Sequence, residues 1–495
     1  MSPSTCELAV RLHEAVLQRD IQLAQELVEA GADVNAVVRL KPDAEGCSVL
    51  HTAIEAHCSL ELLTWLLVTA EADADARDEL GETALHHAAR RGLLQHVQLL
   101  VRAGDGDVEA TCRKGKTALH SAACSGQLAV AQWLAKEGTD VRASNLCGYT
   151  ALHYAAGHGY LGLVQWLTSD MGVDMNARSL YAKTPMHHAA IAGRIEVLAW
   201  LLQQPGADKA ARDDSGRDLV HLAAQSGKLP TLQWLATEAG FSLAVRNPKS
   251  GGTALHAAAL AGQLDTVKWL ADHPARCGRL LVALDKEGHT AADKAALKGH
   301  LGVLKHLAPR SSSSSSRTLL HSAASGGDLR SVRWLVEEAA ADVGACRATD
   351  GCTALHLAST LAVAEYLVGA GAAITAVSSE ATGCQTALET MCQAQAKAAS
   401  NEGLRRFLAQ QLALADPSLA ASVFVRLPAE AMHDAIAAVA CGRQQDARQH
   451  EAYKASELER VRAAQDLYVQ AACALKRARV GGALKRARVG GASSF

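Results

Sequence analysis

Residues 148–177 read GYTALHYAAGHGYLGLVQWLTSDMGVDMNA, and this stretch decides the fold. A short turn leads into Thr150, which opens a first helix that ends at Gly159. A second helix follows, and its apolar side chains lie on one face of a 3.6-residue period: Leu163, Val164, Trp166 and Leu167. Two helices this short cannot bury their own apolar faces. The pattern therefore predicts a copy of the unit on each side.

Copies of this unit occur along most of the chain. Aligned on the histidine of Thr-x-x-His, they place the following residues in one equivalent position: His13, His51, His86, His120, His153, His187, His221, His256, Asp293, His321, His356 and Glu389. Most steps between these positions are 33 to 35 residues, and the exceptions are 38, 37 and 28. A period of this length predicts a stack in which each unit contacts only its neighbours.

The repeated motif resembles the ankyrin repeat, a turn-helix-helix unit of roughly 33 residues with the signature T-P-L-H-x-A. The closest copies of this signature lie at 83–86, 117–120, 184–187, 253–256 and 353–356. The resemblance covers about residues 5–412. It implies an all-α ankyrin-repeat solenoid of about twelve helix-turn-helix units with short β-hairpin turns, followed by a helical tail. It also implies that each motif histidine is structural and bonds its opening turn to the neighbouring repeat.

Departures from the repeat suggest where the chain divides. A run of serines at 311–316 replaces the hairpin of the ninth repeat, and such a run favours disorder. Beyond Pro417 the repeat stops. The predicted domains are a stack of repeats one to nine at 5–308, a serine-rich hinge at 309–316, a stack of repeats ten to twelve at 317–412, a helical tail at 417–479 and a disordered basic tail at 480–495.

The composition excludes several classes of function. Net charge is −2, and the last 22 residues hold six Lys/Arg, so the remainder has 43 basic against 51 acidic residues. This balance disfavours nucleic acid as a partner. The 13 cysteines form no CxxC pair or Cys/His quartet, so no metal or other cofactor is expected. No signal peptide and no run of about 18 apolar residues is seen, which predicts a cytoplasmic protein, with the nucleus as an alternative, and no membrane insertion.

The seven tryptophans all fall in second helices: Trp65, Trp133, Trp166, Trp200, Trp234, Trp269 and Trp334. Six of them lie 13 residues after the motif histidine, where the ankyrin pattern has a core leucine. An indole can bury about 150–250 Å² of surface. This register predicts an internal ladder of indoles, one in each of these repeats.

Four of the seven tyrosines lie between residues 149 and 181. In the ankyrin pattern, the residue after the turn glycine and the residue after the histidine face the concave groove, which places Tyr149 and Tyr154 there. Clustered aromatic side chains are typical of binding hot spots, although ordinary surface variation would also produce them. With the equivalent positions of adjoining units, the predicted partner-binding residues are Leu146, Tyr149, Tyr154, Leu180, Tyr181, His188 and Ile191.

Signatures of catalysis are absent from the sequence. There is no GxxxxGK[ST], no GxGxxG after a strand, no GxSxG and no HExxH. About 80 residues lie outside the predicted stack, too few for most catalytic domains. Together with the resemblance, this predicts a non-catalytic module that binds a partner protein, rather than a small-molecule substrate, through its groove and hairpin tips. The identity of the partner and the oligomeric state stay open.

The tail suggests an alternative, a scaffold or adaptor with a second function. Residues 427–432, LPAEAM, look like the start of an F-box, which would recruit a ubiquitin ligase. Two basic clusters match a nuclear-import pattern: Lys476, Arg477 and Arg479, then Lys485, Arg486 and Arg488. An inert basic tail and weak contact with a polyanion remain open interpretations of the same residues.

Overall fold

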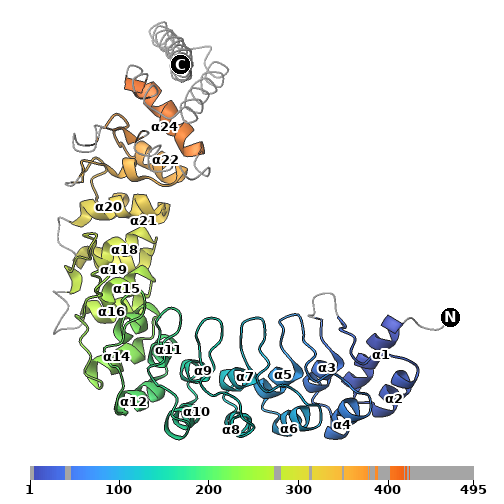
Figure 1. The fold of residues 1–495 in the computed structure, drawn as a ribbon. Coiled ribbons are helices and arrows are strands. Elements are labelled where there is room, and N and C mark those ends of the chain that lie inside the picture. The colour runs from blue at the N-terminus through green and yellow to red at the C-terminus, as the bar shows by residue number, and fades with distance from the viewer. Residues whose placement is uncertain are drawn as a thin grey trace, which may run out of the picture. The chain divides into compact units, whose positions relative to one another are not determined.

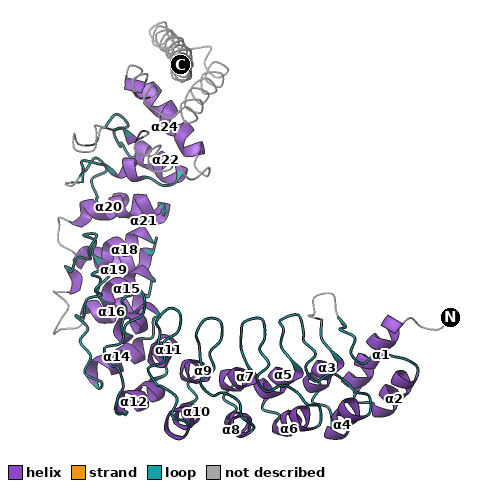
Figure 2. Cartoon of the chain, viewed as in Figure 1, coloured by secondary structure: helices purple, strands orange, loops and turns teal. Residues whose placement is uncertain are grey.

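The chain is a succession of paired helices joined by loops (Figures 1 and 2). The computed structural model describes residues 5–39, 46–272, 280–310, 315–347, 350–376, 378, 385–387, 389, 402–416, 419–420 and 423. The chain divides into two compact units, residues 1–254 and 255–495, and each is a separate stack of helices.

The described helices of the first unit alternate between a first and a second helix of each repeat. In chain order they are α1 (Thr5–Gln18) and α2 (Ile21–Glu29), α3 (Val49–Glu55) and α4 (Leu60–Val68), α5 (Ala84–Arg91) and α6 (Leu94–Arg102), α7 (Ala118–Cys124) and α8 (Leu128–Lys136), α9 (Ala151–His158) and α10 (Leu161–Gln165) with the π-helical η1 (Trp166–Asp170), α11 (Pro185–Ala192) and α12 (Ile195–Gln203), and α13 (Leu219–Gln225) and α14 (Leu229–Thr237). First helices pack on first helices, and several second helices pack on second helices, in two rows (Figure 1).

The second unit continues the same pairing. Helix α15 (Ala254–Leu260) begins at the boundary and precedes α16 (Leu264–Asp272), and the described helices that follow are α18 (Ala291–Leu297) and α19 (Leu301–Leu307), the 3₁₀ helix η2 (Ala308–Arg310), α20 (Ser315–Gly326) and α21 (Leu329–Glu337), the 3₁₀ helix η3 (Ala354–Leu357) and α22 (Leu361–Gly369), and α24 (Glu402–Ala415). The paired-helix stack confirms the predicted all-α architecture. The count of twelve repeats and the tail stay predictions.

The motif threonine and histidine together begin the first helix of most repeats. In repeat five, Thr150 has extended backbone angles and its amide donates to His153 Nδ1 at 3.1 Å. Because Nδ1 accepts, Nε2 carries the ring hydrogen and donates to the carbonyl of Lys183, in the next repeat, at 3.1 Å. The same bond to the following repeat recurs from His51, His86, His120, His187, His221, His256, His321 and His356. The predicted structural role of the motif histidine is therefore confirmed.

Asp293 takes over this role in the repeat that precedes the serine run. One carboxylate oxygen accepts from the amide and hydroxyl of Thr290, at 2.9 and 2.7 Å, and caps α18. The other oxygen accepts from the Ser322 hydroxyl of α20 at 3.1 Å. Helices α18 and α20 also pack against each other, so the described residues on both sides of the serine run are in contact. The hinge at 309–316 stays a prediction.

We expect Asp293→Ala to lower the free energy of unfolding of the second unit by about 2–4 kcal/mol, because three buried donors lose a charged acceptor. Asp293→Asn keeps one acceptor oxygen and should cost less. Urea denaturation followed by circular dichroism measures both effects. Asp265→Ala, at an exposed aspartate of α16, is the matched control. Equal stability of the Asp293→Ala and Asp265→Ala variants would show that the carboxylate is not a structural link.

The core consists mainly of alanine and leucine. In α9, Ala155 and Ala156 are fully buried, and such small side chains let neighbouring first helices approach closely. Large buried side chains fill the space between the two rows, among them Leu119, Leu134, Leu152 and Leu163. The core is therefore continuous from repeat to repeat within each unit, as expected when no single helix pair can bury its own apolar face.

The tryptophans are less buried than the sequence predicts. Trp133 and Trp166 are each 9% exposed, and the other five are partly exposed. The Trp334 indole donates to Glu338 Oε2 at 2.9 Å, and the Lys305 ammonium lies 5.7 Å from its ring centre. The predicted internal ladder therefore holds for Trp133 and Trp166, and the other five indoles are only partly internal. The indoles lie at the border between core and solvent, where the ring covers apolar side chains and its edge meets charged groups.

The turns between repeats fold back on themselves as the predicted short hairpins do, but without regular strands. In each of repeats three to seven two backbone hydrogen bonds close the turn. In repeat five the amide of Asn145 donates to the carbonyl of Tyr149 at 3.0 Å, and the amide of Gly148 donates to the carbonyl of Asn145 at 2.8 Å. Some turns form single β-bridges, and the described residues contain no strand. We call these turns fingers, and number each by its repeat: residues 76–83, 110–117, 143–150, 177–184 and 211–218 are fingers three to seven.

The predictions made for the tail lie outside the described residues. They are the F-box-like start at 427–432, the basic residues Lys476, Arg477, Arg479, Lys485, Arg486 and Arg488, and the disordered tail at 480–495. Of the predicted helical tail at 417–479, only residues 419–420 and 423 are described. Within the described residues, no helix combines the length and the apolar character needed to cross a membrane.

Candidate functional site

The predicted partner-binding residues lie on fingers five and six and on the helices α9 and α11 that follow them. Large apolar side chains at the finger tips are strongly exposed: Leu146 is 69%, Leu180 68% and Tyr181 58% accessible. The two tips are neighbours, because the amide of Leu180 donates to the carbonyl of Cys147 at 3.0 Å. Gly148 makes this approach feasible. Its φ is +74°, and an added Cβ would lie 3.0 Å from the Leu180 nitrogen.

Aromatic side chains form the floor beside these tips. The ring centres of Tyr149 and Tyr154 are 5.9 Å apart, and the Tyr149 ring lies 4.8 Å from the imidazole of His188, both pairs edge to face. The Asn145 side-chain amide donates to the Tyr154 hydroxyl at 2.8 Å and holds that ring in place. Ile191 lies one turn after His188 on α11, so both are on one face of the helix. We call the seven residues Leu146, Tyr149, Tyr154, Leu180, Tyr181, His188 and Ile191 the tyrosine patch.

The side chains of the tyrosine patch are uncharged at neutral pH. Burial raises the pKa of both Tyr149 and Tyr154, so the phenols stay protonated. Burial lowers the pKa of His188 to about 3, helped by the neighbouring His153, so the imidazole stays neutral. The Nε2 atom of His188 is buried without a hydrogen-bond partner. The patch therefore combines exposed apolar tips with a neutral aromatic floor.

One contact of this patch escaped the sequence reasoning. The Lys116 ammonium, from finger four, lies 4.7 Å above the Tyr154 ring, within the range of a cation–π interaction. Lys116 precedes the motif threonine of repeat four, as Tyr149 does in repeat five. A comparison of equivalent positions in adjacent repeats would have indicated that a cation borders the tyrosines.

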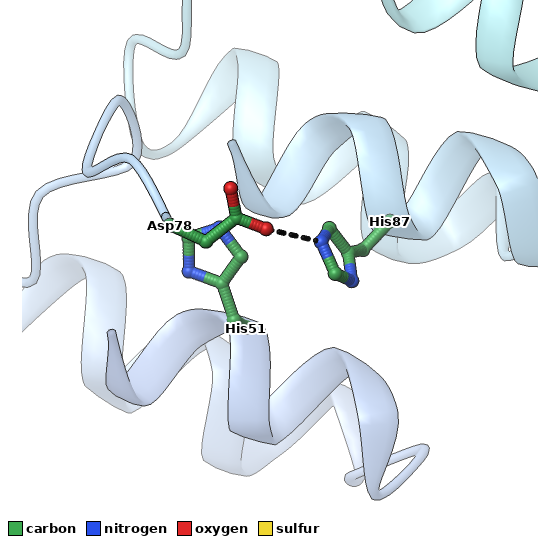
Figure 3. Close-up of side chains that lie close together, drawn as sticks. All are labelled: His51, Asp78 and His87. Atoms are coloured by element: carbon green, nitrogen blue, oxygen red, sulfur yellow. Dashed lines mark hydrogen bonds and ion pairs between the residues drawn. The ribbon is translucent and has the colours of Figure 1, made fainter. Parts of the chain in front are cut away.

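A cluster of His51, Asp78 and His87 joins repeats two and three (Figure 3). Their ligand atoms lie within 4.8 Å of one another, and His87 Nε2 bonds Asp78 Oδ2 at 3.0 Å. However, both nitrogens of His51 are already used. Nδ1 accepts from Ser48, and Nε2 donates to the carbonyl of Glu82 at 3.0 Å. A metal ion here would displace the bond that links the two repeats, so the cluster is better suited to a structural role.

A second group, Asp285, Glu287 and His289 in the turn that precedes α18, also brings ligand atoms together. The Lys294 ammonium already lies among them, 2.8 Å from Asp285 and 2.7 Å from Glu287. These ion pairs lower the pKa of the Glu287 carboxyl, mainly through the bond from Lys294. The Lys294 ammonium therefore already occupies the space between the two carboxylates.

Comparison with known proteins shows which family the chain resembles. The family model described as ankyrin repeats (3 copies) matches residues 50–145, 137–213, 220–317 and 306–378, and no catalytic domain was found. A search of curated proteins finds no match. The matched residues make up more than half of the chain and include most of the helix pairs, the motif histidines from His51 to His356, and fingers three to six. The chain belongs to the ankyrin repeat family.

Proposed function

We propose that this protein is a non-catalytic binding module that holds a partner protein on the tyrosine patch. The exposure of Leu146, Leu180 and Tyr181 on two adjacent finger tips is the observation that supports this most directly. Solvent-exposed apolar side chains that cluster beside aromatic rings are typical of the centre of an interface.

The binding mechanism follows from the rigidity of the stack. Finger backbones bond to one another, and their histidines bond to the next repeat, so the patch is already ordered before a partner arrives. A preorganised surface loses little conformational entropy on binding, and more of the interaction energy appears as affinity. The exposed side chains at the finger tips would insert into the partner, while the ring edges of Tyr149 and Tyr154 would orient it.

The test is a variant with Leu146→Ser, Leu180→Ser and Tyr181→Ser in the full chain. Proximity labelling in cells would identify partners, and purified partners would then be titrated against wild type and variant. Loss of anchor side chains at a hot spot costs about 2 kcal/mol or more, which is at least about a thirtyfold rise in Kd. The matched control is Val37→Ser with Val68→Ser, which removes apolar side chains that are 58% and 59% exposed elsewhere in the same unit. Unchanged binding by the patch variant would refute the proposal.

A second candidate is an adaptor whose tail acts separately from the stack. The LPAE sequence at 427–430 and the two basic clusters after residue 475 favour it. The adaptor would bring a ubiquitin-ligase component to the partner, or carry the partner into the nucleus from the cytoplasm. Pull-down with the full chain and with a variant carrying Lys485→Ala, Arg486→Ala and Arg488→Ala, together with imaging of both, distinguishes a tail function from binding by the stack alone.

A further inference from the structure

Charge is distributed unevenly over the fingers of the first unit. Fingers four, five and six contain five basic residues and no acidic residue: Arg113, Lys114, Lys116, Arg178 and Lys183. Finger three has one basic and three acidic residues, a balance of −2, and finger seven has two basic and three acidic residues, a balance of −1. A basic segment of three fingers, with net charge +5, therefore lies between two acidic fingers.

The cations of fingers four to six also lack partners of opposite charge. Within the described part of the chain, none of the five forms an ion pair, whereas some charged residues of the adjoining fingers do. Arg90 pairs with Glu82 of finger three, and Arg217 pairs with Asp213 of finger seven at 2.7 Å. Arg113 and Lys114 are exposed to solvent. Unpaired cations held on ordered backbone are free to pair with an incoming anion at little cost.

The basic residues border the tyrosine patch directly. The amide of Leu146 donates to the carbonyl of Lys114 at 3.1 Å, so the tip of finger four is bonded to the tip of finger five. The ammonium of Lys116 rests on the Tyr154 ring. The apolar tips of Leu146 and Leu180 are thus followed, one finger further toward the N-terminus, by Arg113 and Lys114.

We infer that the occupant of the tyrosine patch is an extended peptide segment that carries acidic residues beside a pair of apolar residues. The inference rests on the proposed function and names the chemistry of the partner. Packed helices are about 8–10 Å apart, and an extended chain covers about 3.3 Å per residue, so adjacent fingers correspond to about three residues of peptide. The segment therefore has two apolar residues about three positions apart, at fingers five and six. An acidic residue lies about three positions beyond them, at finger four.

The charges at the ends of the patch argue against a nucleic acid in this position. A phosphodiester chain carries its charge along its whole length, and the acidic fingers three and seven would repel it on both sides. The exposed leucine side chains at the tips have no charge and no hydrogen-bond donor for a phosphate. A short peptide matches both features, because its acidic and apolar residues occupy separate positions.

A display library of random 12-residue peptides, selected on the immobilised full-length chain, tests the inference. We expect enriched peptides to carry two apolar residues about three positions apart. An Asp or Glu should lie about three positions beyond this pair. A fluorescent copy of an enriched peptide should bind the Arg113→Glu, Lys114→Glu variant about tenfold more weakly than wild type, with a smaller dependence on salt. The matched control is Lys136→Glu with Lys209→Glu, which reverses two exposed cations outside the fingers and should leave affinity unchanged.

The outcomes separate this inference from the proposed function. If enriched peptides are apolar with no acidic preference, or if the Arg113→Glu, Lys114→Glu variant binds as wild type does, the inference is wrong and the patch still binds. If the finger-tip variant with Leu146→Ser, Leu180→Ser and Tyr181→Ser selects the same peptides as wild type, the proposed function itself fails. Binding of a single-stranded oligonucleotide that competes with the peptide, or self-association that buries the patch, would overturn the acidic-peptide assignment.

Discussion

Acidification from pH 7 to pH 5 is expected to remove most of the stability of the first unit. Burial lowers the pKa of His13, His120 and His153 to about 4, and that of His188 to about 3. In the unfolded chain these imidazoles titrate near pH 6.5. The unfolded state therefore binds protons that the native state excludes, and stability falls as the pH decreases from 6.5 toward 4.

The expected size of this effect is large. At about 1.4 kcal/mol for each pKa unit, one such histidine loses about 2 kcal/mol of its contribution by pH 5. Four of them lose on the order of 8 kcal/mol, which is comparable to the whole stability of a typical domain, about 5–15 kcal/mol. Carboxylates change the stability in a different pH range. The pKa of Asp350 is held at about 2 by Arg347, so its contribution is lost only below its ordinary value of 3.8.

Urea denaturation of the full chain at pH 7, 6 and 5, followed by tryptophan fluorescence, measures the effect. The free energy of unfolding should fall with a slope of roughly four protons. His188→Phe removes one buried imidazole that makes no bond to a carbonyl, and should reduce the slope by about one proton. His158→Phe, at an exposed histidine, should leave the slope unchanged. A midpoint that stays constant between pH 7 and pH 5 would contradict the prediction.

Trp166→Ala is expected to lower the free energy of unfolding of the first unit by about 3–5 kcal/mol, the usual cost of removing a buried tryptophan. Trp166 is 9% exposed and begins the π-helical turn between two fully packed residues, Val164 and Leu167. Urea titration of the variant, followed by circular dichroism, gives the loss.

The comparison with Trp65→Ala decides whether depth of burial sets this cost. Trp65 occupies the same helix of repeat two but is partly exposed, so its removal should cost roughly half as much, in proportion to the apolar area lost. Equal losses of unfolding free energy in the two variants would mean that the exposure of the indole does not determine the cost of removing it. A loss below about 1 kcal/mol for Trp166→Ala would mean that the indole is not part of the core.

The positions of the helices could be predicted because their signals are local and repeated. Thr150 and His153 are three residues apart and bond each other at the start of α9, and the same pair recurs in most repeats. Helix ends are equally local, as at Gly159, whose positive φ ends α9. The role of Asp293 could not be predicted in the same way. Its second partner, Ser322, is 29 residues away and is brought near only when α18 packs on α20.

In the candidate site, too, the local positions were predicted from the sequence and the contacts between repeats were not. Tyr149 and Tyr154 were identified from their places in the motif, and the structure adds their contacts with each other and with His188. The sequence reasoning did not connect them with finger four, because Lys116 and Tyr154 are 38 residues apart and meet through the bonding of one finger to the next. The depth of the tryptophans was misjudged for a related reason. Neighbouring side chains such as Lys305 decide how much of each indole meets solvent.

The amino-acid sequence by itself determined the period of the repeat, the start and end of most helices, and the histidine that bonds one repeat to the next. Those features depend on residues a few positions apart, and the same local pattern occurs in most repeats. Only the tertiary structure decided which cations border the tyrosines, how far each indole is exposed, and which acceptor replaces a missing histidine. Each of these depends on side chains from different repeats, which come together because helix pairs gain their stability by packing on one another.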